Sequence, residues 1–189
     1  MQKLLCAASI ALFTTTADAQ SFYVGATLGE SIGDASPSQA VEEFDLDTNR
    51  RVLAGRKFTD SLAVEASYHD FGDASGSVSP CATPCTPDIP VGLRSSTDAW
   101  SLRLAYLIGE GQWQPFAALG WTWSSTEGSA RGIGSGVRVG YGNSDDGFSA
   151  EIGTRVRLQR GFALRAGFEW FDLVGARDGA FNVGADYSF

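Results

Sequence analysis

The feature that most constrains this chain is an alternation of apolar residues with polar or small ones, which recurs in eight segments after Gln20. Side chains along a β-strand point alternately to opposite faces, so this alternation predicts strands with one apolar face. Helical periodicity is hard to find anywhere in the same region. The predicted strands cover residues 22–29, 50–58, 62–72, 98–107, 113–125, 148–159, 162–173 and 179–189.

The connections between these segments alternate in length. Tight turns are predicted at residues 59–61, 108–112 and 160–161, and long loops at 31–49, 73–97 and 126–147, with a short seventh connection at 174–178. Most strands also have about the 9 to 11 residues that a tilted strand needs to cross a bilayer. Short turns on one side and long loops on the other are typical of outer-membrane barrels. The sequence therefore predicts an all-β fold, an eight-stranded antiparallel up-and-down transmembrane β-barrel.

Apolar side chains share one parity in each predicted strand, as in Trp100, Leu102, Leu104 and Tyr106. The aromatic members of this face lie at two heights, near the strand ends, with Val, Leu, Ile and Ala between them. Amphipathic rings prefer the two membrane interfaces, so this arrangement indicates a barrel in lipid. A secreted soluble barrel of lipocalin type would show the same alternation with its apolar face turned inward, but it has no reason to sort its aromatics to two rims.

The N-terminal residues 1–19 have the features of a secretory signal peptide. Lys3 is followed by an apolar run to Phe13 and by the small-x-small site Ala17-Asp18-Ala19. The barrel domain is then predicted to cover residues 20–189. A formal net charge of −8 argues against attraction to nucleic acid. No internal stretch approaches 18 consecutive apolar residues, which excludes a polytopic helical membrane protein.

The order of these segments resembles the eight-stranded OmpA/OmpX-type family of outer-membrane barrels. The resemblance rests on the opening FYVGATLG at 22–29, on EASYHDFG at 65–72, on its echo FEWFDL at 168–173, and on the closing strand that ends in Phe189. It extends over the whole predicted barrel domain and implies a location in the outer membrane of a Gram-negative-type bacterium.

The same resemblance implies partners. They are outer-membrane lipid and lipopolysaccharide, and the barrel-assembly machinery, which would read the closing residues Tyr187 and Phe189 as its signal. The chain stops at the closing strand, so the peptidoglycan-binding domain of full-length OmpA is expected to be absent. Small barrels of this kind serve as envelope structural proteins, adhesins or host-defence evasion proteins. We therefore expect a structural envelope or adhesin-like role, with an extracellular ligand bound through the long loops.

Charged residues of both signs lie on the parity opposite to the apolar face. The interior of an eight-stranded barrel is only wide enough for side chains, and buried charges need partners. The sequence therefore predicts an interior ion-pair network, with a small or gated channel as the alternative. The predicted members are Glu65, Arg103, Glu151, Arg155, Arg157, Arg165, Glu169 and Asp186.

Cys81 and Cys85 lie among four prolines in the second long loop. In an oxidising compartment this spacing favours a local disulfide, which would stiffen the loop. Zinc needs about four ligands and only two are visible, so we expect no metal site.

His69 is the only histidine, which limits nucleophilic chemistry. A His–Ser pair could act on lipid at the outer interface, but His69 has the lumen parity. No calcium loop or phosphate-binding glycine motif is present, and we expect neither enzyme activity nor a cofactor. Four hypotheses follow from the sequence: a structural or adhesive barrel, a small channel, a lipid-A-modifying enzyme and a secreted soluble binding barrel.

Overall fold

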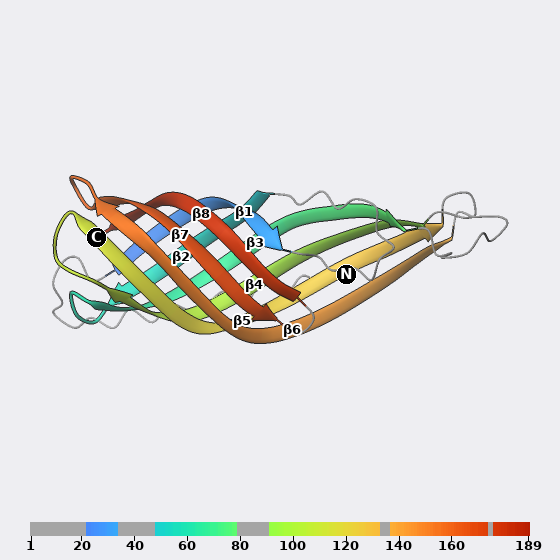
Figure 1. Cartoon of the computed structure of the whole chain (residues 1–189), viewed down its shortest axis with the longest axis horizontal. Coiled ribbons are helices and arrows are strands. Elements are labelled where there is room, and N and C mark those ends of the chain that lie inside the picture. Colours follow the sequence, from blue (N-terminus) through green and yellow to red (C-terminus); the bar gives the residue numbers. More distant parts are fainter. Residues whose placement is uncertain (1–21, 34–47, 79–90, 133–136, 174–175) are drawn as a thin grey trace.

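The computed structural model describes residues 22–33, 48–78, 91–132, 137–173 and 176–189. Eight strands form a closed antiparallel barrel in which each pairs with its neighbours in sequence and β1 also pairs with β8 (Figure 1). Within the described ranges, no helix is long and apolar enough to cross a membrane. The predicted fold class is confirmed. The strands are β1 (Phe22–Gly33), β2 (Thr48–Lys57), β3 (Leu62–Val78), β4 (Val91–Leu107), β5 (Trp113–Gly132), β6 (Arg138–Arg157), β7 (Phe162–Leu173) and β8 (Ala176–Ser188).

Two predicted features lie outside the described residues. They are the signal peptide at residues 1–19 and the disulfide between Cys81 and Cys85. Both stay predictions.

Four strands are much longer than predicted. β3 and β4 have 17 residues each, and β5 and β6 have 20. Their pairing continues through stretches predicted as loops, as far as Val78 opposite Val91 and Arg131 opposite Arg138. The predicted loops at 73–97 and 126–147 are therefore wrong over most of their described parts. These extensions are rich in Gly and Ser, which weakens the apolar alternation, so the criterion that found the membrane-spanning segments missed them.

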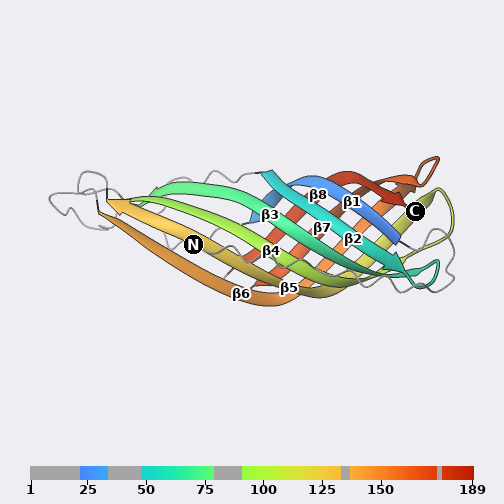
Figure 2. The same cartoon turned by 180° about the vertical axis from the view of Figure 1, so that it is seen from behind.

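The long strands project from one end of the barrel as an open sheet. In Figures 1 and 2, β3, β4, β5 and β6 run far beyond the ends of β1, β2, β7 and β8, on the side opposite to the short turns and the C-terminus. β3 leaves the barrel wall at a register shift between Asp70 and Asp73, where Gly72 has a φ of 73°. A bulge of this kind bends a strand locally. We call the extended part, residues 73–78, 91–96, 127–132 and 138–147, the projecting sheet.

The alternate apolar side chains of each strand point outward all around the barrel. Leu104, Leu119 and Ile152 are exposed, whereas Arg103 and Glu151, from the opposite parity, are buried. Because an apolar belt of this kind is stable only in contact with hydrocarbon, the alternative of a soluble lipocalin-like barrel is wrong. The exposed aromatic side chains include Trp100, Trp121, Trp123 and Phe148 toward the projecting sheet, and Tyr106, Trp113, Phe162, Tyr187 and Phe189 toward the short turns.

Candidate functional site

Six charged side chains from five strands meet inside the barrel. All are between 0% and 3% exposed, and they comprise three cations and three anions. We call them the central charge cluster: Arg51, Glu65, Arg103, Glu151, Arg165 and Glu169.

Two of the three carboxylates lie directly opposite each other, Glu151 on β6 and Glu169 on β7. Like charges in this position destabilise a sheet unless cations separate them. Arg51 Nη1 donates to Glu151 Oε2 at 2.9 Å and to Glu169 Oε2 at 3.4 Å. Arg103 Nη1 also donates to both carboxylates, at 3.1 Å to Glu151. The two arginines thus bridge the acidic pair from the far wall of the barrel.

Arg165 completes the cluster through a two-pronged contact with Glu65. Its Nη1 donates to Glu65 Oε1 at 2.6 Å and its Nη2 donates to Oε2 at 3.0 Å. The Tyr23 hydroxyl donates to the same carboxylate at 2.6 Å. The Tyr23 ring fits there because it lies against Gly55, where any side chain would overlap it. Paired N–H···O bonds to a carboxylate are among the strongest in proteins, so this corner is rigidly held.

The cluster spans the lumen from one wall of the barrel to the other. Equal numbers of positive and negative charges offset the cost of burying each one, which for a single unpaired ion is several kcal/mol. Most of these contacts join residues 40 or more positions apart in sequence, such as Arg51 with Glu151 at a separation of 100. The cluster therefore ties opposite walls of the barrel together.

Three further predicted lumen residues lie below the cluster, toward the short turns. Arg155 Nε donates to both carboxylate oxygens of Asp186 at 2.9 Å, and both side chains are buried. Arg157 does not join any lumen network among the described residues. It is exposed, and its Nη1 donates to the backbone carbonyl of Glu110 at 3.3 Å. The reason is its position at the last residue of β6, where the wall ends and water reaches both faces.

Sequence reasoning missed Arg51, which contacts all three carboxylates of the cluster. Arginines occupy both parities of its strand, at Arg50, Arg51 and Arg56, so alternation alone does not single out the buried one. The strand register identifies Arg51 as the buried arginine, because Arg51 pairs with the buried His69 on β3.

His69 is enclosed in the lumen and is 0% exposed. Its Nε2 lies 3.1 Å from Ser67 Oγ and 3.6 Å from Glu169 Oε1, and its ring packs on Phe71 and Phe171. The ring has no access to lipid at the outer interface. The arrangement therefore suits a core histidine and gives no support to a lipid-modifying His–Ser pair.

The projecting sheet carries its cations on the outward face. Arg131 and Arg138 are directly opposite each other on β5 and β6, and Arg94 on β4 lies opposite Ser129. All three arginines are exposed. Arg138 Nη2 donates to Ser129 Oγ at 3.1 Å, and no ion pair of these arginines is found among the described residues. The outward face of the sheet tip is therefore cationic.

The inward face of the same sheet is largely apolar, and no described strand lies across from it (Figure 1). Val139 and Tyr141 of β6 are 59% and 47% exposed, although residues of the same parity further along β6 are buried. The pairing of β6 with β7 covers only 148–157, so within the described chain residues 138–147 pair with β5 alone. The sheet thus offers two faces and a free edge to the medium.

The predicted assembly residues lie at the short-turn rim. Tyr187 packs against Phe162 with ring centroids 4.8 Å apart, and the Phe189 N–H donates to the Phe22 carbonyl at 3.0 Å. Both side chains face outward.

A closed antiparallel barrel with an apolar exterior, two aromatic girdles and a charged interior defines a transmembrane β-barrel of the outer-membrane type. The chain belongs to the family described as outer membrane protein beta-barrel domain, whose model matches residues 4–189. It is thus a protein of the Gram-negative outer membrane.

Solved structures share this fold at low sequence identity. OprG from Pseudomonas aeruginosa is 14% identical, with a TM-score of 0.60, and the match covers 90% of this chain and 96% of OprG. Ail, the attachment invasion locus protein of Yersinia pestis, is 13% identical with a TM-score of 0.54, covering 90% of this chain and 97% of Ail. A second Ail structure, in complex with the heparin analogue sucrose octasulfate, has a TM-score of 0.53 at the same identity and coverage. Comparison with curated protein sequences gives no match.

Proposed function

We propose that this protein is a surface-interaction protein, adhesin-like in its role, which binds an extracellular ligand through the projecting sheet. The observation that carries the proposal is the cationic outward face formed by Arg94, Arg131 and Arg138 on strands that extend well beyond the barrel wall. Arginines recognise carboxylate, sulfate and phosphate groups through paired donors. The ligand class that suits this face is therefore an anionic polymer such as a sulfated polysaccharide.

The Ail structure supports this choice of probe, because that barrel is seen in complex with a heparin analogue. The central charge cluster supports a mainly structural role for the lumen, since its buried side chains fill one layer of the barrel. We also propose, from the sequence, that residues 1–19 are removed on export, that Cys81 and Cys85 form a disulfide, and that the barrel-assembly machinery reads Tyr187 and Phe189.

The test compares cells that display the wild-type protein with cells that display Arg131→Gln/Arg138→Gln, measured for binding to immobilised heparin. We expect the double variant to bind at least about tenfold more weakly, on the scale of 1.5–3 kcal/mol per charged hydrogen bond. The matched control is Arg157→Gln/Arg160→Gly, which removes two exposed arginines at the opposite rim and should leave heparin binding unchanged. Equal loss in both variants would contradict the proposal, as would full binding by the first.

A second variant removes the β5–β6 part of the sheet tip, with Arg131 and Arg138. Glu127 and Gly142 are directly opposite, so residues 128–141 can be replaced by Asn-Gly, which closes a two-residue hairpin. The barrel below should fold as before, shown by the altered mobility of the unheated protein on an SDS gel. Retention of heparin binding by this variant would place the binding surface elsewhere.

A further inference from the structure

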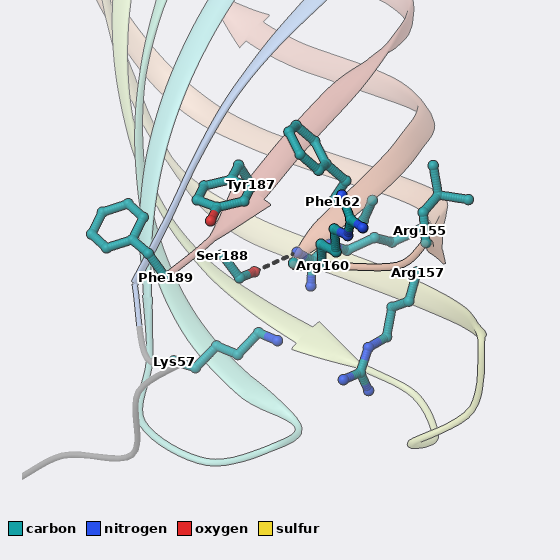
Figure 3. Close-up of a pocket in the computed structure, with 11 residues that line it drawn as sticks. Lys57, Arg155, Arg157, Arg160, Phe162, Tyr187, Ser188 and Phe189 are labelled. Carbon is teal, nitrogen blue, oxygen red and sulfur yellow. Dashed lines mark hydrogen bonds between the residues drawn. The ribbon is translucent and has the colours of Figure 1, made fainter.

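A cavity of about 430 Å³ opens at the short-turn rim, between the ends of β2, β6, β7 and β8. Outer-membrane barrels carry their short turns on the periplasmic side, so this cavity lies at the inner leaflet. Figure 3 shows Lys57 and Arg157 below the rings of Phe162 and Tyr187, with Phe189 at the same rim. The space equals roughly fourteen water volumes at about 30 Å³ each, which is more than one bound water cluster needs.

The lining of this cavity is strongly cationic. It contains Lys57, Arg155, Arg157 and Arg160, and no Asp or Glu side chain. Among the described residues only Arg155 is neutralised, by Asp186. Lys57 and Arg160 form no ion pair there, and Arg157 contacts only the Glu110 carbonyl. Even with a carboxylate on Phe189 counted, the lining stays positive, so the cavity suits an anion.

The turn that carries Arg160 gives an independent indication. Arg160 has a φ of 62°, and it is the one residue other than glycine in the described chain with a positive φ. Gly161 follows with a φ of 84°, so the turn is of the kind that ordinarily contains Asn-Gly. An arginine in the left-handed region is strained, and such strain is characteristic of functional positions. The cavity and the conformation of Arg160 thus point to the same turn.

The apolar side of the lining identifies the kind of anion. Phe162, Tyr187 and Phe189 belong to the outward aromatic girdle, and all three also line the cavity. The cavity thus lies where the lumen mouth meets the lipid, with cations toward the mouth and rings toward the hydrocarbon. A free inorganic anion would contact only the cationic side chains of this lining and not the aromatic rings.

We propose that the cavity binds the phosphate group of an anionic phospholipid of the inner leaflet, with Arg157, Arg160 and Lys57 on the phosphate and the girdle rings against the glycerol and acyl chains. Paired donors from arginine suit phosphate oxygens, and cationic clusters at a membrane surface favour anionic over zwitterionic lipids. The bound lipid would fix the height of the barrel in the inner leaflet.

The test measures binding of short-chain lipids to the folded barrel by native mass spectrometry, below their micelle concentrations. The probes are dihexanoyl-phosphatidylglycerol, dihexanoyl-phosphatidylcholine and inorganic phosphate. We expect phosphatidylglycerol to bind about tenfold or more tightly than phosphatidylcholine and inorganic phosphate. Inorganic phosphate binding as tightly as phosphatidylglycerol would show a free-anion site and overturn the lipid assignment, as would equal affinity for the two lipids.

The variants then locate the site. Arg157→Gln/Arg160→Gly should weaken phosphatidylglycerol binding by about tenfold, whereas Arg131→Gln/Arg138→Gln at the far end should not change it. Arg160→Gly alone relieves the strained φ, so it should fold at least as well as the wild type and still lose affinity. Unchanged affinity in the Arg160→Gly variant would overturn the proposal. Because the two double variants exchange roles between this test and heparin binding, failure of one proposal is distinguishable from failure of the other.

Discussion

The membrane-spanning part of β5 and β6 and their extensions in the projecting sheet are made from the same continuous strands, yet their two faces have opposite character. In the barrel, Leu119 faces outward and is exposed, while Glu151 faces inward and is buried. In the projecting sheet, the outward face has Arg131 and Arg138, and the inward face has Val139. The alternation of side chains continues without interruption, but the polarity of each face is exchanged.

The medium explains this exchange. Hydrocarbon surrounds the barrel, so its outward side must be apolar and its polar groups must find partners inside. Above the membrane, water surrounds the sheet and charges are stable on the outward face. Among the described residues no strand lies across from the projecting sheet (Figure 1), so its inward face has no described partner for a buried charge. The same strand thus carries two patterns because it passes through two solvents.

The largest effect that would test this comparison is expected from Glu151→Gln in the central charge cluster. Glu151 accepts hydrogen bonds from Arg51, Arg103 and Arg165, and its neutralisation would leave three buried cations with two carboxylates. We expect the free energy of unfolding to fall by about 3–5 kcal/mol, measured by urea unfolding in lipid vesicles. The control Glu127→Gln, exposed in the projecting sheet, should change it by less than about 0.5 kcal/mol.

An arginine placed on each apolar face gives the next contrast. Leu104→Arg faces hydrocarbon and should cost about 2–4 kcal/mol of unfolding free energy near the midplane. Val139→Arg lies on an exposed apolar face in water and should cost no more than about 0.5 kcal/mol. Similar costs at the two positions would mean that they share one environment, and the exchange of polarity would lose its explanation.

The smallest effect concerns one hydrogen bond at the edge of the cluster. Tyr23→Phe removes the donor to the buried Glu65 carboxylate and keeps the ring against Gly55. We expect a loss of about 1–3 kcal/mol in the free energy of unfolding, since the carboxylate keeps only its arginine partners. Tyr106→Phe, on the outward face at 55% exposure, is the matched control and should be close to neutral. A loss in the control as large as that in Tyr23→Phe would assign the effect to the phenol itself rather than to the cluster.

The membrane-spanning half of the fold could be predicted from sequence because one strong driving force acts on it. Leu102 and Leu104 alternate with Ser101 and Arg103, because a strand in the barrel wall needs one apolar face toward the lipid and one polar face toward the lumen. The projecting sheet could not be predicted in the same way. Many of its residues, such as Ser95, Gly128 and Ser129, are small, which weakens the alternation, and their pairing depends on the register set lower in the hairpin.

The central charge cluster could be predicted from the sequence only in part. The inward parity of Glu65 and Glu169 follows from alternation, but their partners do not, because the barrel brings residues from non-adjacent strands together. Arg157 shows the converse. It has the lumen parity, but at the last residue of β6 it is exposed and joins no ion pair among the described residues.

The amino-acid sequence by itself determined that this protein is an eight-stranded barrel with lipid outside and charge inside, because alternation over a bilayer's thickness is a local property of each strand. Only the tertiary structure decided that Arg51 meets Glu151 across the lumen, that four strands continue as a sheet above the membrane, and that Arg160 joins Lys57 at the inner rim. Those contacts depend on strand register and on closure of the barrel, and closure requires all eight strands together.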